Sequence, residues 1–79
     1  MGTKNKPGTF DCYANAEPDE PMFVVLARDR SAPEVVDEWA RIREYDINRG
    51  VKPESDRPMV DEARECAAAM RDWRTANRK

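Results

Sequence analysis

Side chains that commonly carry catalysis are scarce in this 79-residue sequence. It has no histidine, which removes the commonest base at neutral pH and the usual activator of a serine or cysteine nucleophile. Two carboxylates spaced four residues apart, Asp61 and Glu65, could act as a general acid and base, but such pairs are common on solvated helices. The sequence therefore favours a non-enzymatic protein.

The two cysteines, Cys12 and Cys66, are too few for a zinc site, which needs about four ligands. Two thiols in a chain without an export signal are more often reduced than paired, although the sequence leaves a disulfide open. The three glycines do not form a phosphate-binding loop. We expect no metal, no cofactor and no small-molecule ligand.

The acidic residues are the most suggestive feature, because the charge is unevenly distributed although the net charge is only -2. No lysine or arginine occurs between Pro7 and Ala27. An acidic surface can occupy a basic groove that normally holds nucleic-acid phosphates, and a solvated face is the plain alternative. The candidate partner-binding residues are Asp19, Glu20, Glu34, Asp37, Glu38 and Glu44.

The two ends of the chain are basic and provide an alternative function. Cations near the C-terminus could bind nucleic-acid phosphates, or they could simply complement the negative end of a helix dipole. In this alternative the protein is a small nucleic-acid-binding or regulatory module that uses Lys4, Lys6, Arg71, Arg74, Arg78 and Lys79.

Two long helices must position most of these residues. Residues 31–34 read Ser-Ala-Pro-Glu, a capping box that predicts the start of a helix over 32–48. Gly50 is expected to stop this helix, because glycine can adopt the left-handed conformation that closes a helix. Asp56, as a capping oxygen followed by a proline in the first turn, predicts a second helix over 56–77. At helical spacing, the expected core stripe of the first helix contains Val35, Trp39 and Ile42, with Val36, Ala40 and Ile47 beside it and Tyr45 on the other flank. The expected stripe of the second helix contains Met59, Ala63, Cys66, Met70 and Trp73, with Val60 and Ala67 on its margin.

The region before these helices is harder to predict. Residues 1–9 lack an apolar anchor and read as a disordered tail, so that 10–79 form a single helical domain. Residues 22–27 suit a buried strand, but the acids and prolines just before them favour a short helix over 20–28. The expected fold is all-α, a compact bundle of about three helices with a flexible N-terminal tail.

Size and hydropathy set two further expectations. A domain this small has a core of marginal stability. A partner protein or a second copy in a homodimer could therefore contribute to its stability. No apolar run approaches the roughly 18 residues of a membrane span, and the N-terminus lacks a secretory signal. We expect a cytoplasmic protein with no membrane contact.

The chain from Phe10 onward resembles small proteins carried by phages and prophages of alphaproteobacteria. The resemblance lies in residues 18–29, 32–33, 38–40, 59–60, 62–63 and 66–67 and in Met70. In size and acidic character the chain is also similar to anti-CRISPR inhibitors of type I surveillance complexes. This resemblance implies a phage-encoded, non-enzymatic inhibitor in the host cell that binds a CRISPR effector subunit and blocks target DNA.

Overall fold

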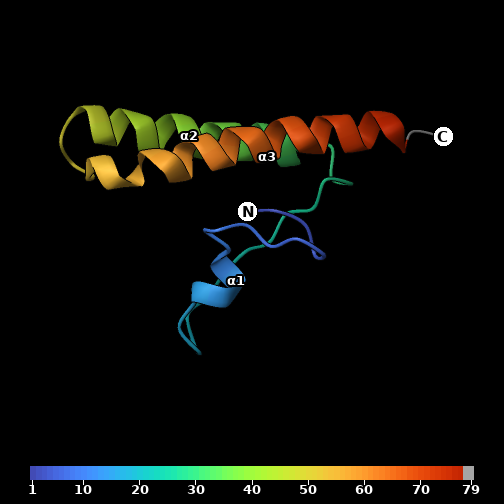
Figure 1. The fold of residues 1–79 in the computed structure, drawn as a ribbon, viewed down its shortest axis with the longest axis horizontal. Helices are drawn as coiled ribbons and strands as arrows, with labels where there is room; N and C mark the ends of the chain where they lie inside the picture. The colour runs from blue at the N-terminus through green and yellow to red at the C-terminus, as the bar shows by residue number, and fades with distance from the viewer. Residues whose placement is uncertain (78–79) are drawn as a thin grey trace.

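The computed structural model describes residues 1–77 and contains two long antiparallel helices that lie side by side (Figure 1). The helices are α1 (Cys12–Asn15), α2 (Ala32–Asn48) and α3 (Arg57–Ala76), and a 3-10 turn, η1 (Glu54–Asp56), precedes α3. No strand occurs in the described residues. The expected all-α fold with three helices, one of them short, is confirmed.

Both long helices start and end close to the expected positions. Each has a proline in its first turn, where the missing N–H would have no helical partner. The helix α2 ends before Gly50, whose φ of 78° is strained for any residue with a Cβ. Both expected caps are wrong, because neither the Ser31 nor the Asp56 side chain makes a capping hydrogen bond. Instead, the carboxylate of Asp29 accepts a hydrogen bond from the Ser31 amide at 2.9 Å.

The interface between α2 and α3 is built mostly from small side chains. Ala40 of α2 and Val60, Ala63 and Ala67 of α3 are completely buried, and Ile47 is nearly so. Alanine at these positions lets two helix axes approach closely, because no long side chain separates the backbones. The core is therefore thin and sensitive to added volume.

The residues buried between α2 and α3 lie mostly beside the expected apolar stripes rather than on them. On α3, Val60 and Ala67 face α2, while Cys66 and Met70 are only half-buried and Trp73 is exposed. The reason is that α3 faces other parts of the chain on two sides. One side packs against α2. On the other side, Cys66, Met70 and Trp73 line a hollow together with residues of the N-terminal segment. On α2 the stripe that contains Val35, Trp39 and Ile42 is largely exposed, with only Trp39 packed against the core.

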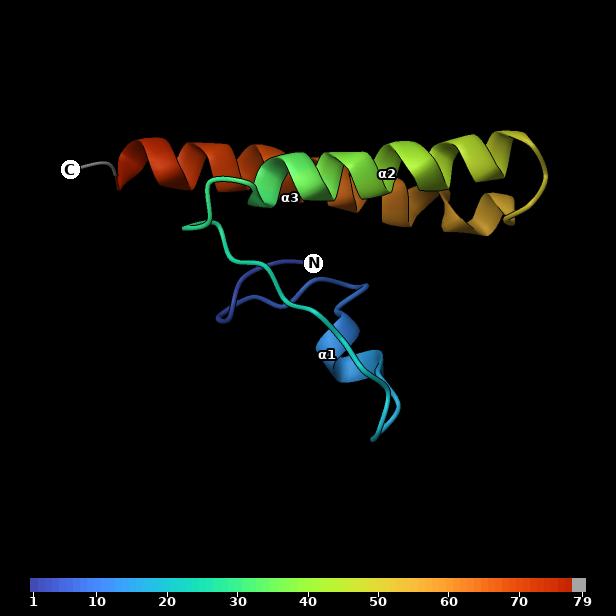
Figure 2. The same ribbon diagram turned by 180° about the vertical axis from the view of Figure 1, so that it is seen from behind.

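The expected short helix over 20–28 is wrong. Residues 20–26 have neither helix nor strand and run from the turn after α1 up to α2 (Figures 1 and 2). Apolar residues occupy consecutive positions there, so a helix would have no single face to bury. The short helix lies instead at Cys12–Asn15, where the carboxylate of Asp11 caps the first turn by accepting from the Tyr13 amide at 2.9 Å.

Glu62 of α3 holds the segment that the sequence predicts to be a disordered tail. Its carboxylate oxygens accept hydrogen bonds from the amides of Thr9 and Phe10, at 2.9 and 3.2 Å. The N-terminal ammonium of Met1 lies 3.5 Å from the same carboxylate, and Met1 packs against the core. A single carboxylate thus connects both ends of residues 1–10 to α3.

Replacing Glu62 with glutamine is expected to lower the unfolding free energy by about 1 kcal/mol and to speed proteolysis within residues 1–10. The amide keeps one acceptor oxygen but loses the charge and the second acceptor, and bonds to charged groups contribute about 1.5–3 kcal/mol when well shielded. The measurement is limited proteolysis followed by mass spectrometry. The matched control is Glu65→Gln, an exposed position on the same helix. Equal cleavage of both variants would mean that the segment is detached in solution.

Candidate interaction surface

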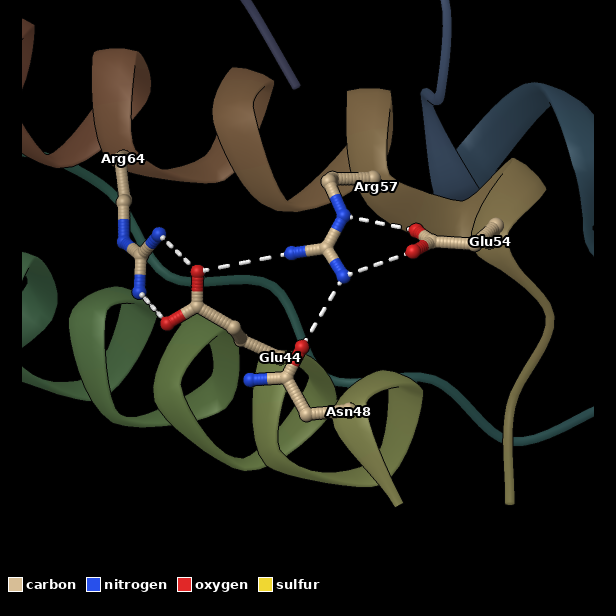
Figure 3. Close-up of polar contacts among 5 residues, drawn as sticks. All are labelled: Glu44, Asn48, Glu54, Arg57 and Arg64. Atoms are coloured by element: carbon tan, nitrogen blue, oxygen red, sulfur yellow. Dashed lines mark hydrogen bonds and ion pairs between the residues drawn. The ribbon is translucent and has the colours of Figure 1, made fainter. Parts of the chain in front are cut away.

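Two of the six candidate carboxylates are bound by arginines of the neighbouring helix rather than free for a partner. The carboxylate of Glu44 on α2 accepts two hydrogen bonds from the guanidinium of Arg64 on α3, both at 2.9 Å (Figure 3). Arg57 lies 3.8 Å from the same carboxylate and also binds Glu54, at 2.7 Å, and Asn48, at 3.0 Å. Glu44 is therefore the centre of a network that joins α2 to α3 and η1.

Asp37 extends this network along the helix pair. Its carboxylate accepts from Arg71 at 2.7 Å, one arginine further along α3. Three of the four arginines of α3 recur every seven residues, at 57, 64 and 71, and two of the carboxylates of α2, at 37 and 44, are also seven apart. This matched spacing was visible in the sequence and predicts an ion-pair ladder between antiparallel helices. Sequence analysis by charge alone missed it.

Glu38 is paired within its own helix. The Arg41 guanidinium binds its carboxylate, with Nε donating to Oε2 at 3.0 Å. Hydrogen bonding from Arg41 lowers the pKa of Glu38, and hydrogen bonding from Arg64 lowers the pKa of Glu44. Half of the candidate acidic residues thus have their charge balanced inside the chain.

The other three candidates, Asp19, Glu20 and Glu34, form no ion pair with any of the described residues. Glu34 lies in the first turn of α2. Asp19 and Glu20 lie in the turn after α1, which both ribbon views place far from the long helices (Figures 1 and 2). The six candidates therefore do not form one continuous acidic surface.

The basic candidates are also divided. Arg71 is paired with Asp37, while Arg74 donates to the carbonyl of Arg30 at 3.4 Å. Arg71 and Arg74 line an open hollow together with Arg28 and the Trp73 ring. Lys4 and Lys6 are exposed on the N-terminal segment, and Arg78 and Lys79 lie outside the described residues.

The two cysteines do not pair with each other. Cys12 and Cys66 are both free, and burial raises the pKa of the Cys66 thiol, which makes it less reactive. Within residues 1–77, no group of three or more metal-binding side chains is brought together. The same residues include no helix with the length and hydropathy to cross a membrane.

The paired carboxylates predict a loss of stability at acid pH. Arginine contacts lower the pKa of Glu38, Glu44 and Glu54 below the ordinary value of 4.5. Their contribution is fully present above the unfolded pKa and disappears as the pH falls through the lower, folded pKa. The thermal midpoint, measured in low salt, should therefore fall as the pH is lowered from about 5 to 3.

Replacing Glu44 with glutamine should flatten this acid limb more than Glu65→Gln, because Glu44 accepts from two arginines and Glu65 is exposed. High salt should reduce the difference by screening exposed charges. An acid limb of equal slope in both variants would show that the Glu44 network does not form.

Comparison of the chain with protein-family models, with curated proteins and with solved structures finds no match. A function must therefore be argued from the residues themselves.

Proposed function

We propose that the protein acts without catalysis, by binding a protein partner through an arm formed by residues 17–26. The observation that carries this proposal is the exposure of a large apolar group directly beside unpaired acids. Phe23 is 84% exposed, and Met22, Val24 and Leu26 are also exposed in the same extended segment. Exposed apolar patches of this kind in small proteins commonly mark interaction sites.

The backbone of the arm supports the same proposal. Residues 21–25 make no backbone hydrogen bond with any of the described residues. A partner can pair with such an extended backbone and receive its side chains in pockets, as in strand addition to a sheet edge. The apolar part of the arm would supply affinity.

The acids at the base of the arm favour a basic partner. Glu17, Asp19 and Glu20 precede the apolar residues, and no lysine or arginine interrupts the region. Charge complementarity of this kind steers association and excludes acidic partners. The acidic contact is thus concentrated at Asp19 and Glu20, with Glu34 as a separate acid on α2, while the paired Asp37, Glu38 and Glu44 contribute less.

The resemblance to phage proteins supplies the first partner to test, a type I CRISPR surveillance complex. In this proposal the protein is a phage-encoded inhibitor that occupies part of the basic surface where target DNA binds. A pull-down from a host lysate that expresses the complex, analysed by mass spectrometry, tests the partner. Recovery of another protein without any Cas subunit would exclude this partner.

The arm is tested with purified complex and labelled target DNA. Asp19→Lys with Glu20→Lys, and separately Phe23→Ala, should each raise the concentration of protein needed for half-inhibition at least tenfold, because central contacts often contribute about 2 kcal/mol or more. The control is Glu65→Lys with Asp72→Lys, which makes the same charge change at exposed positions of α3. Unchanged inhibition by the arm variants would refute the proposed surface.

A second candidate function is nucleic-acid binding, favoured by the hollow that Arg28, Arg71, Arg74 and Trp73 line. Guanidinium groups bind phosphates, and an aromatic ring can stack on a base. The pairing of Arg71 with Asp37 reduces the available charge. A gel-shift titration with the isolated protein separates the two functions, since salt-sensitive binding of DNA would favour this candidate.

A further inference from the structure

The helix α2 has an apolar face that α3 does not cover. Val35 is 50% exposed, Ile42 48% and Tyr45 57%, although all three lie on a helix that packs against another. The residues of α2 that face α3 are others, Ala40 and Ile47. Exposed apolar side chains thus follow α2 along most of its length.

The two halves of this face differ in shape. The N-terminal half contains a shallow hollow lined by Ser31, Glu34, Val35, Glu38, Trp39 and Ile42. The Trp39 ring that forms one wall is held by Arg43, whose guanidinium lies 5.1 Å from the ring centre and also binds Asp56 at 2.8 Å. The hollow is therefore supported by contacts within the chain. It presents apolar walls with the carboxylate of Glu34 at its edge, beside Glu38, whose charge Arg41 balances.

The C-terminal half of this face instead carries an exposed aromatic ring, that of Tyr45, with an arginine beside it. The guanidinium of Arg49 lies over the Tyr45 ring, 5.1 Å from its centre. Stacking of this kind holds a cation beside an aromatic ring. An aromatic ring with an attached positive charge matches a hollow with apolar walls and an acidic edge.

We propose that a second copy of this chain covers the face, with the two α2 helices antiparallel about a two-fold axis near Ile42. Ile42 lines the C-terminal end of the hollow, next to the Tyr45–Arg49 group, so an axis at this position places each such group over the hollow of the other copy. Arg49 of one copy then lies beside Glu34 of the other, which has no ion pair with any of the described residues. A two-fold axis makes this contact twice, which gives complementary charge at both ends of the interface.

The size of the face sets the strength of the dimer. With 17 residues, α2 is about 25 Å long and about 10 Å across, so its face covers about 250 Å² on each copy. The total of about 500 Å² is below the roughly 1,000 Å² of a stable specific interface, which makes this a weak, transient dimer. We therefore expect dissociation in the upper micromolar range. This inference depends on α2 alone and is independent of the function proposed for the arm.

Sedimentation velocity over a concentration series from about 1 μM to about 1 mM tests the dimer. The wild-type chain should shift from monomer to dimer across this range. Ile42→Glu places two like charges together at the axis and should weaken the dimer at least tenfold. The control is Val51→Glu, which introduces the same charge at an exposed apolar residue in the connection after α2 and should leave the dimer intact.

A charge exchange tests the antiparallel arrangement. Glu34→Arg and Arg49→Glu should each weaken the dimer several-fold, and the two changes in one chain should restore it. Helical circular dichroism confirms that each variant is folded. A wild-type chain that stays monomeric throughout the series overturns the proposal, as does a dimer that survives Ile42→Glu. Failure of the double variant to recover overturns the antiparallel pairing.

Discussion

Replacing Ala63 with leucine is expected to lower the unfolding free energy by about 1–3 kcal/mol, the usual cost of overpacking a well-filled core. Ala63 is completely buried on α3, against an interface that also contains Ala40 of α2. A leucine side chain at this position must push α2 away from α3. That movement would also lengthen the ion pairs between the helices, such as Glu44 with Arg64. Small domains have little stability in reserve, so partial unfolding at 37 °C is the expected outcome.

The measurement is chemical denaturation followed by circular dichroism. Ala68→Leu is the matched control, because Ala68 is exposed on the same helix and both residues have high helix propensity. The control should change the unfolding free energy by less than about 0.5 kcal/mol. Similar destabilisation at both positions would show that the close contact between α2 and α3 does not form.

Replacing Ile47 with alanine is expected to lower the unfolding free energy by about 2–5 kcal/mol. Here the cause is lost volume in the core rather than added volume. Ile47 is the largest aliphatic side chain in the core cluster and lies near the C-terminal end of α2. Its removal leaves a cavity that small neighbours such as Val60 and Ala63 cannot fill. The loss in free energy is a large part of the total stability expected of a domain this size.

Ile42→Ala is the control for this variant, because Ile42 is half exposed on the same helix. Below the concentration at which the chain dimerises, it should cost less than about 1 kcal/mol. At higher concentration the same variant loses dimer stability, so denaturation midpoints should be compared at two protein concentrations. If Ile42→Ala and Ile47→Ala are equally destabilising in the monomer, the assignment of the buried face of α2 is wrong.

The ion pairs between the long helices reduce the number of candidate acidic residues that are free to bind a partner. Asp37 and Glu44 help to hold α2 against α3, and their arginine partners are exposed or only partly buried. Such exposed pairs contribute little stability individually, but their regular spacing favours one alignment of the helices. Of the six candidate acids, those without an ion pair among the described residues are Asp19 and Glu20 in the arm and Glu34 on α2.

Local signals in the sequence determined the two long helices. Prolines in the first turns and the glycine at position 50 act within a few residues of the helix ends, so α2 and α3 could be predicted almost to the residue. The charge and exposure of Asp19 and Glu20 could also be predicted, because their neighbours are polar or proline. The all-α class followed from the same local signals.

Only the tertiary structure decided which faces are buried and which charges are free. Both long helices have apolar residues on more than one side, so the sequence pattern leaves the rotation of each helix about its axis open. That rotation brings Arg71 to Asp37, 34 residues away, and leaves Ile42 exposed. Residues 20–26 are extended for a different reason: their apolar residues are consecutive, so a helix there would have no single apolar face to bury.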